Sequence, residues 1–230
     1  MRRFCFVFLT CSLVIYGQNS KNTIQNWFDF DGSYSLNAQW KVYGDAGYRV
    51  ILGDETSHRF YIRPTGFLQL NNILTLHAGI ACFITYNNAN TLKELRPFQG
   101  ITINWPKISS IPFTHYIRFE ERLFSSSNSS SLIYRWRYQL GIRIRVDENK
   151  EEKYFYIPLQ LEWFANYNRD FSLKFNEFRA VFGTGFVFNN LLRFEFNAIF
   201  QNPNAHLEKI YTFNDIIFRF RIYKEFNTDI

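Results

Sequence analysis

Apolar and polar side chains alternate along most of the chain, and the clearest case is the segment from Leu132 to Val146. Its even-numbered residues are apolar: Tyr134, Trp136, Tyr138, Leu140, Ile142, Ile144 and Val146. Its odd-numbered residues, the other parity, are mostly cationic: Arg135, Arg137, Gln139, Gly141, Arg143 and Arg145. Because successive side chains of a strand point to opposite faces, the pattern predicts a two-faced β-strand. Soluble strands usually run about 5–6 residues, whereas a tilted membrane-spanning strand needs roughly 9–11. The length of this segment therefore favours a strand that crosses a membrane.

The same alternation predicts ten further strands. With the first segment they are Ile24–Leu36, Trp40–Leu52, Arg59–Leu70, Ile73–Tyr86, Glu94–Trp105, Phe113–Phe124, Leu132–Val146, Tyr154–Tyr167, Lys174–Phe188, Leu191–Gln201 and Tyr211–Phe226. The connections alternate between tight turns and longer polar loops, which is typical of outer-membrane barrels. Two connections, Pro106 to Pro112 and Asp147 to Lys153, fall in the short series by order but are long.

The number of strands conflicts with this architecture. A closed single-chain barrel with both chain ends in the periplasm needs an even number of strands, whereas the pattern yields an odd number. Either a strand near the N-terminus is poorly formed, or one strand has been split or merged. We therefore expect an all-β fold, a transmembrane antiparallel up-and-down β-barrel of twelve strands, with ten strands as the alternative.

A soluble exported β-sandwich, acting as a binding domain, is the competing fold, since its strands alternate as well. The long strands, the alternating connection lengths and the aromatic residues at the ends of the apolar faces argue against it. These aromatic residues are Trp40, Tyr86, Trp105 and Tyr167. The charged face is rich in arginine and glutamate and poor in lysine, which suits a salt-bridged lumen better than an open solvent face.

The first residues have the features of an export signal. Arg2 and Arg3 precede an apolar run from Phe4 to Tyr16, and the small residue Gly17 is followed by polar residues. We expect cleavage after Gly17, so that residues 1–17 form the signal peptide and residues 18–230 form a single barrel domain. The alternative, an N-terminal membrane anchor, needs about 20 apolar residues, and this run is shorter. Export and a barrel together predict a place in a bacterial outer membrane.

Composition narrows the functional classes. Aromatic residues make up 20% of the chain, and no stretch after the signal has the length and hydrophobicity of a transmembrane helix, which favours a β-barrel. Loss of Cys5 and Cys11 with the signal leaves Cys82, so no intramolecular disulfide is expected. The formal net charge of +6 falls to +4 when Arg2 and Arg3 are removed. This mild excess predicts no nucleic-acid partner.

The polar parity supplies the candidate site, a network of charged side chains in the lumen. Its members are Glu94, Arg96, Arg118, Glu120, Arg122, Arg135, Arg137, Arg143, Glu162, Glu177, Arg179, Arg193, Glu195, Arg219 and Arg221. Buried charges must be paired to offset their desolvation, so the simplest interpretation is an ion-pair network that fills a narrow lumen. The alternative is a basic constriction that selects small anionic solutes, as charged rings do in pores.

Catalytic patterns are weak. Outer-membrane acyl hydrolases place a serine and a histidine together at the barrel rim, but the residue two positions after His115 is Ile117. Metal-ligand spacings, glycine-rich phosphate loops and nucleophile elbows are not evident. We therefore expect no enzymatic activity and no cofactor or metal. A barrel-embedded lipid-modifying enzyme that uses His115 is the alternative.

Several short motifs, in order, resemble a known family. They are Ile24-Gln25-Asn26-Trp27, Glu94-Leu95-Arg96-Pro97-Phe98-Gln99, Arg118-Phe119-Glu120-Glu121-Arg122, Arg135-Trp136-Arg137-Tyr138 and Phe175-Asn176-Glu177. Together they are similar to the exported bacterial barrel family catalogued as domain of unknown function 2490. The resemblance implies a β-barrel in the outer membrane of a Gram-negative bacterium, without an established activity. The expected partners of the barrel are outer-membrane lipid and the outer-membrane assembly machinery. A terminal aromatic residue is expected to help insertion into the outer membrane, and Phe226 lies near the end of the chain.

Overall fold

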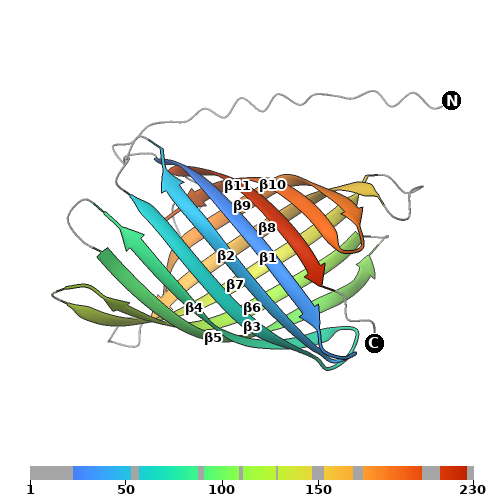
Figure 1. The fold of residues 1–230 in the computed structure, drawn as a ribbon, viewed down its shortest axis with the longest axis horizontal. Coiled ribbons are helices and arrows are strands. Elements are labelled where there is room, and N and C mark those ends of the chain that lie inside the picture. Colours follow the sequence, from blue (N-terminus) through green and yellow to red (C-terminus); the bar gives the residue numbers. More distant parts are fainter. Residues whose placement is uncertain are drawn as a thin grey trace.

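Eleven strands form one closed barrel in the part of the chain that this computed structural model describes (Figure 1). The described residues are 23–52, 57–87, 91–108, 111–127, 129–146, 153–167, 173–203 and 213–226, so the expected signal peptide lies outside them. The strands are β1 (Thr23–Ser35), β2 (Trp40–Ile51), β3 (His58–Gln69), β4 (Leu74–Tyr86), β5 (Thr91–Ile108), β6 (Ile111–Ser125), β7 (Ser130–Arg145), β8 (Tyr154–Tyr167), β9 (Leu173–Asn189), β10 (Leu192–Asn202) and β11 (Asp215–Phe226). Among these residues, no helix has the length and apolar character needed to span a membrane.

Each strand pairs in antiparallel fashion with its neighbours in the chain, and the barrel closes where β1 pairs with β11. This closing pair is parallel, and both arrows point the same way in Figure 1. Its register is regular, from Thr23 opposite Asp215 to Tyr34 opposite Phe226. We call this pair the seam. The register keeps like faces together, because Phe28 lies opposite Phe220 and their rings stack with centroids 5.7 Å apart.

The expected twelve strands, and the alternative ten, are therefore wrong, and so is the β-sandwich. Eleven strands close the barrel, as the alternation pattern had indicated. An even number is required only if the first and last strands run in opposite directions. Here they run in the same direction, and a parallel ladder with evenly spaced, slanted hydrogen bonds joins them.

The two ends of the barrel differ in their connections. One end, the short-connection end, is where β1 leads to β2, β3 to β4, β5 to β6, β7 to β8 and β9 to β10. The opposite end, the long-connection end, is where β2 leads to β3, β4 to β5, β6 to β7, β8 to β9 and β10 to β11. The connection expected at Pro106 to Pro112 is in fact short, because β5 continues to Ile108 and β6 begins at Ile111. The connection between β7 and β8 remains a long member of the short series.

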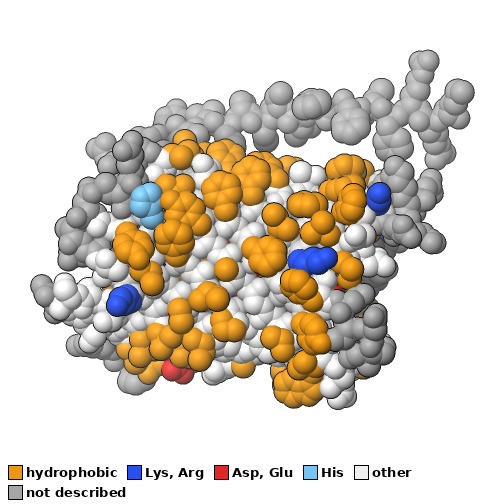
Figure 2. All heavy atoms as spheres, viewed as in Figure 1, with side chains coloured by type: hydrophobic (Ala, Val, Ile, Leu, Met, Phe, Trp, Pro, Cys, Tyr) orange, Lys and Arg blue, Asp and Glu red, His pale blue; other side chains and the backbone are white. Residues whose placement is uncertain are grey.

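The two faces of the barrel wall follow the alternation of the sequence. Large apolar side chains point outward and stay exposed, as on the face in Figure 2, where few charged side chains interrupt them. Phe182 is 56% exposed and Ile62 is 57% exposed, whereas the neighbouring inward Tyr61 is 6% exposed. The buried side chains, most of them polar or charged, therefore lie inside the barrel.

Two inward glycines give room to inward tyrosines. Gly47 lies opposite Tyr61, and Gly185 lies opposite Tyr156. A Cβ atom at either glycine would collide with the tyrosine ring across from it. This pairing of the smallest residue with a large ring lets aromatic side chains, as well as charges, fill the lumen.

The seam can be tested by disulfide trapping. In a background in which Cys5, Cys11 and Cys82 are replaced by serine, the pair Phe28→Cys and Phe220→Cys should cross-link on oxidation. Register partners on adjacent strands lie about 4.8 Å apart, which suits a disulfide. Mobility on a non-reducing gel and peptide mass spectrometry measure the link. The control pair, Phe28→Cys with Ile216→Cys, is four positions out of register and should stay reduced. Equal cross-linking of both pairs would contradict the seam.

Candidate functional site

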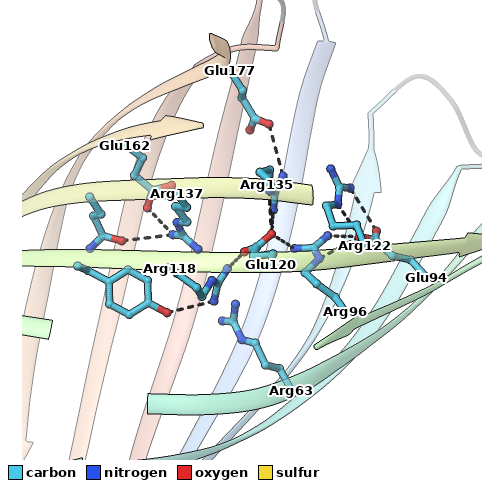
Figure 3. A network of polar contacts seen from close by, with 12 residues as sticks. Arg63, Glu94, Arg96, Arg118, Glu120, Arg122, Arg135, Arg137, Glu162 and Glu177 are labelled. Carbon is cyan, nitrogen blue, oxygen red and sulfur yellow. Dashed lines mark hydrogen bonds and ion pairs between the residues drawn. The ribbon is translucent and has the colours of Figure 1, made fainter. Parts of the chain in front are cut away.

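The centre of the interior is the Glu120 carboxylate, which is fully buried. Three arginines from three adjacent strands surround it (Figure 3). Arg118 on β6 forms an ion pair with Glu120, Arg135 on β7 approaches within 2.5 Å, and Arg96 on β5 lies 3.6 Å away. Alternation brings them together, because all four side chains occupy the inward parity of neighbouring strands. One carboxylate thus holds three guanidinium groups in place.

The ion pairs continue on both sides of Glu120. On one side Glu94 contacts Arg96 at 2.6 Å and Arg122 at 2.7 Å. On the other side Glu177 lies 3.9 Å from Arg135. From Glu177 the chain of contacts passes through Arg179 to Glu162, which lies 3.6 Å from Arg179 and 2.7 Å from Arg137. We call the connected set the Glu120 network: Glu94, Glu120, Glu162, Glu177, Arg96, Arg118, Arg122, Arg135, Arg137 and Arg179.

A second group of polar side chains lies beside the seam. Arg221 contacts Asp29 at 3.4 Å and Asp31 at 3.3 Å, and so joins β11 to β1. Glu195 accepts hydrogen bonds from Tyr156 at 2.8 Å and Tyr223 at 3.4 Å. Two more arginines lie here, and neither forms an ion pair with a carboxylate in the described part of the chain. Arg219 donates to the Asn197 side chain, and the Arg193 guanidinium carbon lies 3.7 Å from the centre of the Tyr223 ring.

Thus the Glu120 network holds ten of the residues that the sequence singled out. The second group, beside the seam, holds four: Arg193, Glu195, Arg219 and Arg221. Arg143 joins neither group; it is exposed near the short-connection end and its guanidinium lies 4.9 Å from the Tyr156 ring centre. Asp45 and Arg63, absent from that set, form a bidentate pair at 2.8 and 2.7 Å. Inward aromatic residues were also missed, although Tyr61 and Phe83 occupy the inward parity that would have identified them.

Arginine side chains line a cavity of about 270 Å³ toward the long-connection end. Nine arginines and a single glutamate, Glu177, contribute to its wall. Seven of these arginines belong to ion pairs described above, and the other two are Arg49 and Arg59. We call it the arginine cavity. The polar side chains of Gln25, Ser57 and Thr85 also reach it, so it lies close to the connections of that end.

Buried side chains lie between the arginine cavity and a second cavity at the short-connection end. The second cavity, of about 420 Å³, shares no lining residue with the first. On β10 the first cavity uses Gln201 and the second uses Arg193, and the inward residues between them are buried to within 5% exposure. These residues are Glu195, Asn197 and Ile199. Asp29 on β1 and Asp45 on β2 occupy the same intermediate position.

His115 lies on the outer face rather than in the lumen. Its Nδ1 is 2.8 Å from the Tyr138 hydroxyl, and its ring meets Trp105 edge-on with centroids 6.0 Å apart. Neither contact supplies the serine, threonine or cysteine that a histidine base usually activates. Elsewhere in the described ranges, no three histidine, cysteine, aspartate or glutamate side chains gather as a metal site would require. Cys82 is free and exposed.

A family model described as "Protein of unknown function (DUF2490)" matches residues 24–210, which include most of the barrel and the whole Glu120 network. No curated protein and no solved structure matches the chain.

The importance of the Glu120 carboxylate can be tested with adjacent isosteric substitutions. Glu120→Gln should lower the free energy of unfolding by about 3 kcal/mol, because it leaves buried guanidinium groups without a counter-charge. Denaturant unfolding of the detergent-folded protein, followed by tryptophan fluorescence, measures the change. Glu121→Gln is the matched control, since Glu121 has the opposite parity and faces outward. Equal destabilisation by both substitutions would contradict a special role for the inward carboxylate.

Proposed function

This chain belongs to that family, and we propose that it is an integral outer-membrane barrel that is closed to diffusion. The arginine cavity is its functional site. The observation that carries the proposal is the combination of an apolar outer face with a polar lumen that buried side chains divide. The outer face favours a membrane environment. The divided lumen favours a binding or structural barrel over an open pore.

The outer face supports membrane insertion. Exposed large apolar side chains occur on every strand. A continuous apolar surface of this kind on a soluble monomer would exceed the few hundred Å² that such proteins usually expose. Even the shortest strand, of 11 residues, reaches about 25 Å along the axis at about 3.3 Å per residue and a tilt of about 45°. That length matches the apolar band of roughly 25 Å in outer-membrane barrels.

Aromatic side chains near the strand ends support the same placement. Trp40 begins β2 and Trp105 lies near the end of β5, both toward the short-connection end. Tyr86 ends β4 and Tyr134 lies near the start of β7, both toward the long-connection end. All four point outward and are exposed. Amphipathic rings at the two rims would sit at the two membrane–water interfaces.

Connection lengths favour one orientation. Outer-membrane barrels have short periplasmic turns and longer outer loops, so the short-connection end would face the periplasm and the arginine cavity would open outward. The expected export signal at residues 1–17 supports this location. Because the seam is parallel, β1 would begin at the cell surface while β11 ends at the periplasmic side.

The contacts of His115 favour a structural role at the outer face over lipid modification. In the usual acyl-transfer site the base lies within hydrogen-bond reach of a serine or cysteine, whereas the hydrogen-bond partner of this histidine is a tyrosine hydroxyl. The ring is therefore better suited to the aromatic surface than to general-base catalysis.

Cell fractionation and bilayer recording test the proposal together. The protein should be recovered in the outer-membrane fraction, require detergent for extraction and give no steady conductance in planar bilayers, because buried side chains divide the lumen. Recovery as a soluble periplasmic protein would overturn the membrane placement. Steady conductance by the folded wild-type barrel would overturn the closed lumen.

Cysteine labelling of whole cells tests the orientation. In a background in which Cys5, Cys11 and Cys82 are replaced by serine, Ser57→Cys at the long-connection end should react with a membrane-impermeant maleimide. Asn190→Cys, in the tight turn between β9 and β10, should react only after the outer membrane is permeabilised. The reverse pattern would place the arginine cavity on the periplasmic side.

A further inference from the structure

Arg49 and Arg59 are the cations of the arginine cavity that form no ion pair with a carboxylate among the described residues. The Arg49 guanidinium carbon lies 3.8 Å from the Trp27 ring centre and 4.8 Å from that of Tyr61. Its Nε is buried and has no hydrogen-bond partner among the residues that the structure describes. Arg59 donates from Nε to the Thr85 hydroxyl at 2.8 Å, which leaves its two terminal nitrogens for another acceptor. Both side chains thus retain N–H donors for a ligand.

The charges around the cavity do not balance. In the Glu120 network six arginines share four glutamates, and Arg49 and Arg59 add two further positive charges. The remaining lining arginine, Arg63, is neutralised by Asp45. Among these lining residues and their ion-pair partners, positive charge therefore exceeds negative charge by four around a cavity of about 270 Å³. Partly buried like charges repel one another strongly unless an anion joins them.

We propose that the arginine cavity binds a dianionic phosphate group, either free phosphate or the phosphate of a small monoester. This inference rests on the proposed outer-membrane placement only for the side from which the anion enters. The planar guanidinium fork matches phosphate oxygens in bidentate fashion. A phosphate also offers more acceptor positions and more charge than a carboxylate, as a site with several converging arginines requires.

The remaining walls fit such a ligand. Gln25, Ser57 and Gln201 offer neutral hydrogen-bonding groups, while Phe83 and Phe164 provide apolar surface for the organic part of a monoester. The aromatic platform of Trp27 and Tyr61 holds the Arg49 guanidinium before the anion arrives. A fixed arginine loses less conformational entropy on binding than a free one, which favours affinity for a small ligand.

The cavity at the short-connection end provides an internal comparison. Its wall carries both signs of charge, with Asp31 and Glu225 facing Lys41, Arg193 and Lys224. Lys41 and Glu225 pair directly at 2.7 Å. Phosphate binding is therefore assigned to the arginine cavity and not to the lumen as a whole.

Thermal unfolding and calorimetry of the full chain in detergent test the site. Inorganic phosphate should raise the unfolding temperature above that in sodium chloride of equal ionic strength, and calorimetry should give a single site. Arg49→Gln and Arg59→Gln should each weaken binding on the order of tenfold or more, because each removes charge-assisted hydrogen bonds. Arg143→Gln, which removes the same charge near the short-connection end, should leave phosphate binding unchanged.

The choice of anion separates the remaining outcomes. Tighter binding of glycerol 3-phosphate than of inorganic phosphate assigns the site to a monoester, and the reverse assigns it to the free ion. Equal stabilisation by succinate would overturn the phosphate assignment. No stabilisation by phosphate, or equal binding by the Arg49→Gln, Arg59→Gln double variant, would overturn the site. Phosphate binding is measured on folded protein in detergent, and membrane fractionation is measured separately. A failure of phosphate binding would therefore leave the proposed outer-membrane placement intact.

Discussion

The buried Glu120 carboxylate is the constraint on which the interior of the barrel depends. Arg96, Arg118 and Arg135 reach it from three adjacent strands, β5, β6 and β7. The contacts continue to Glu94 on β5, and through Glu177 on β9 to Glu162 on β8. A slip of one residue in any of these strands would turn its arginines toward the apolar outer face. The electrostatic network and the strand register are therefore mutually dependent, and removing the central charge leaves several cations without compensation.

The sequence was sufficient to predict the class of fold and the faces of the wall. Period-two alternation over long segments located all eleven strands, and for β8 the expected range, Tyr154–Tyr167, agrees with the structure at both ends. The same alternation identified the inward parity on which the Glu120 network lies. These features follow from local geometry, because the direction of a side chain in a strand depends only on its position along that strand.

The features that the sequence could not supply depend on contacts between distant segments. Nothing in the pattern near Thr23 or Phe226 shows that their strands pair in parallel. The alternation gave eleven strands, but the assumption that both chain ends lie in the periplasm led to an even number instead. Partners within the network were equally inaccessible, since parity gives the face but not the neighbour. The lumen also holds more aromatic rings than expected, because inward Gly47 and Gly185 make room for them.

The parallel seam also constrains how the chain can be rearranged. In most domains the two termini lie close together at one surface, and a short linker between them permits circular permutation. Here Thr23 and Phe226 lie at opposite rims of a barrel, and β1 and β11 run side by side in the same direction between these rims. A linker joining them would have to run the full height of the wall, through the lumen or along its outer surface. Circular permutation of this barrel would therefore need a linker about as long as one of its strands, unless the original ends are left unjoined.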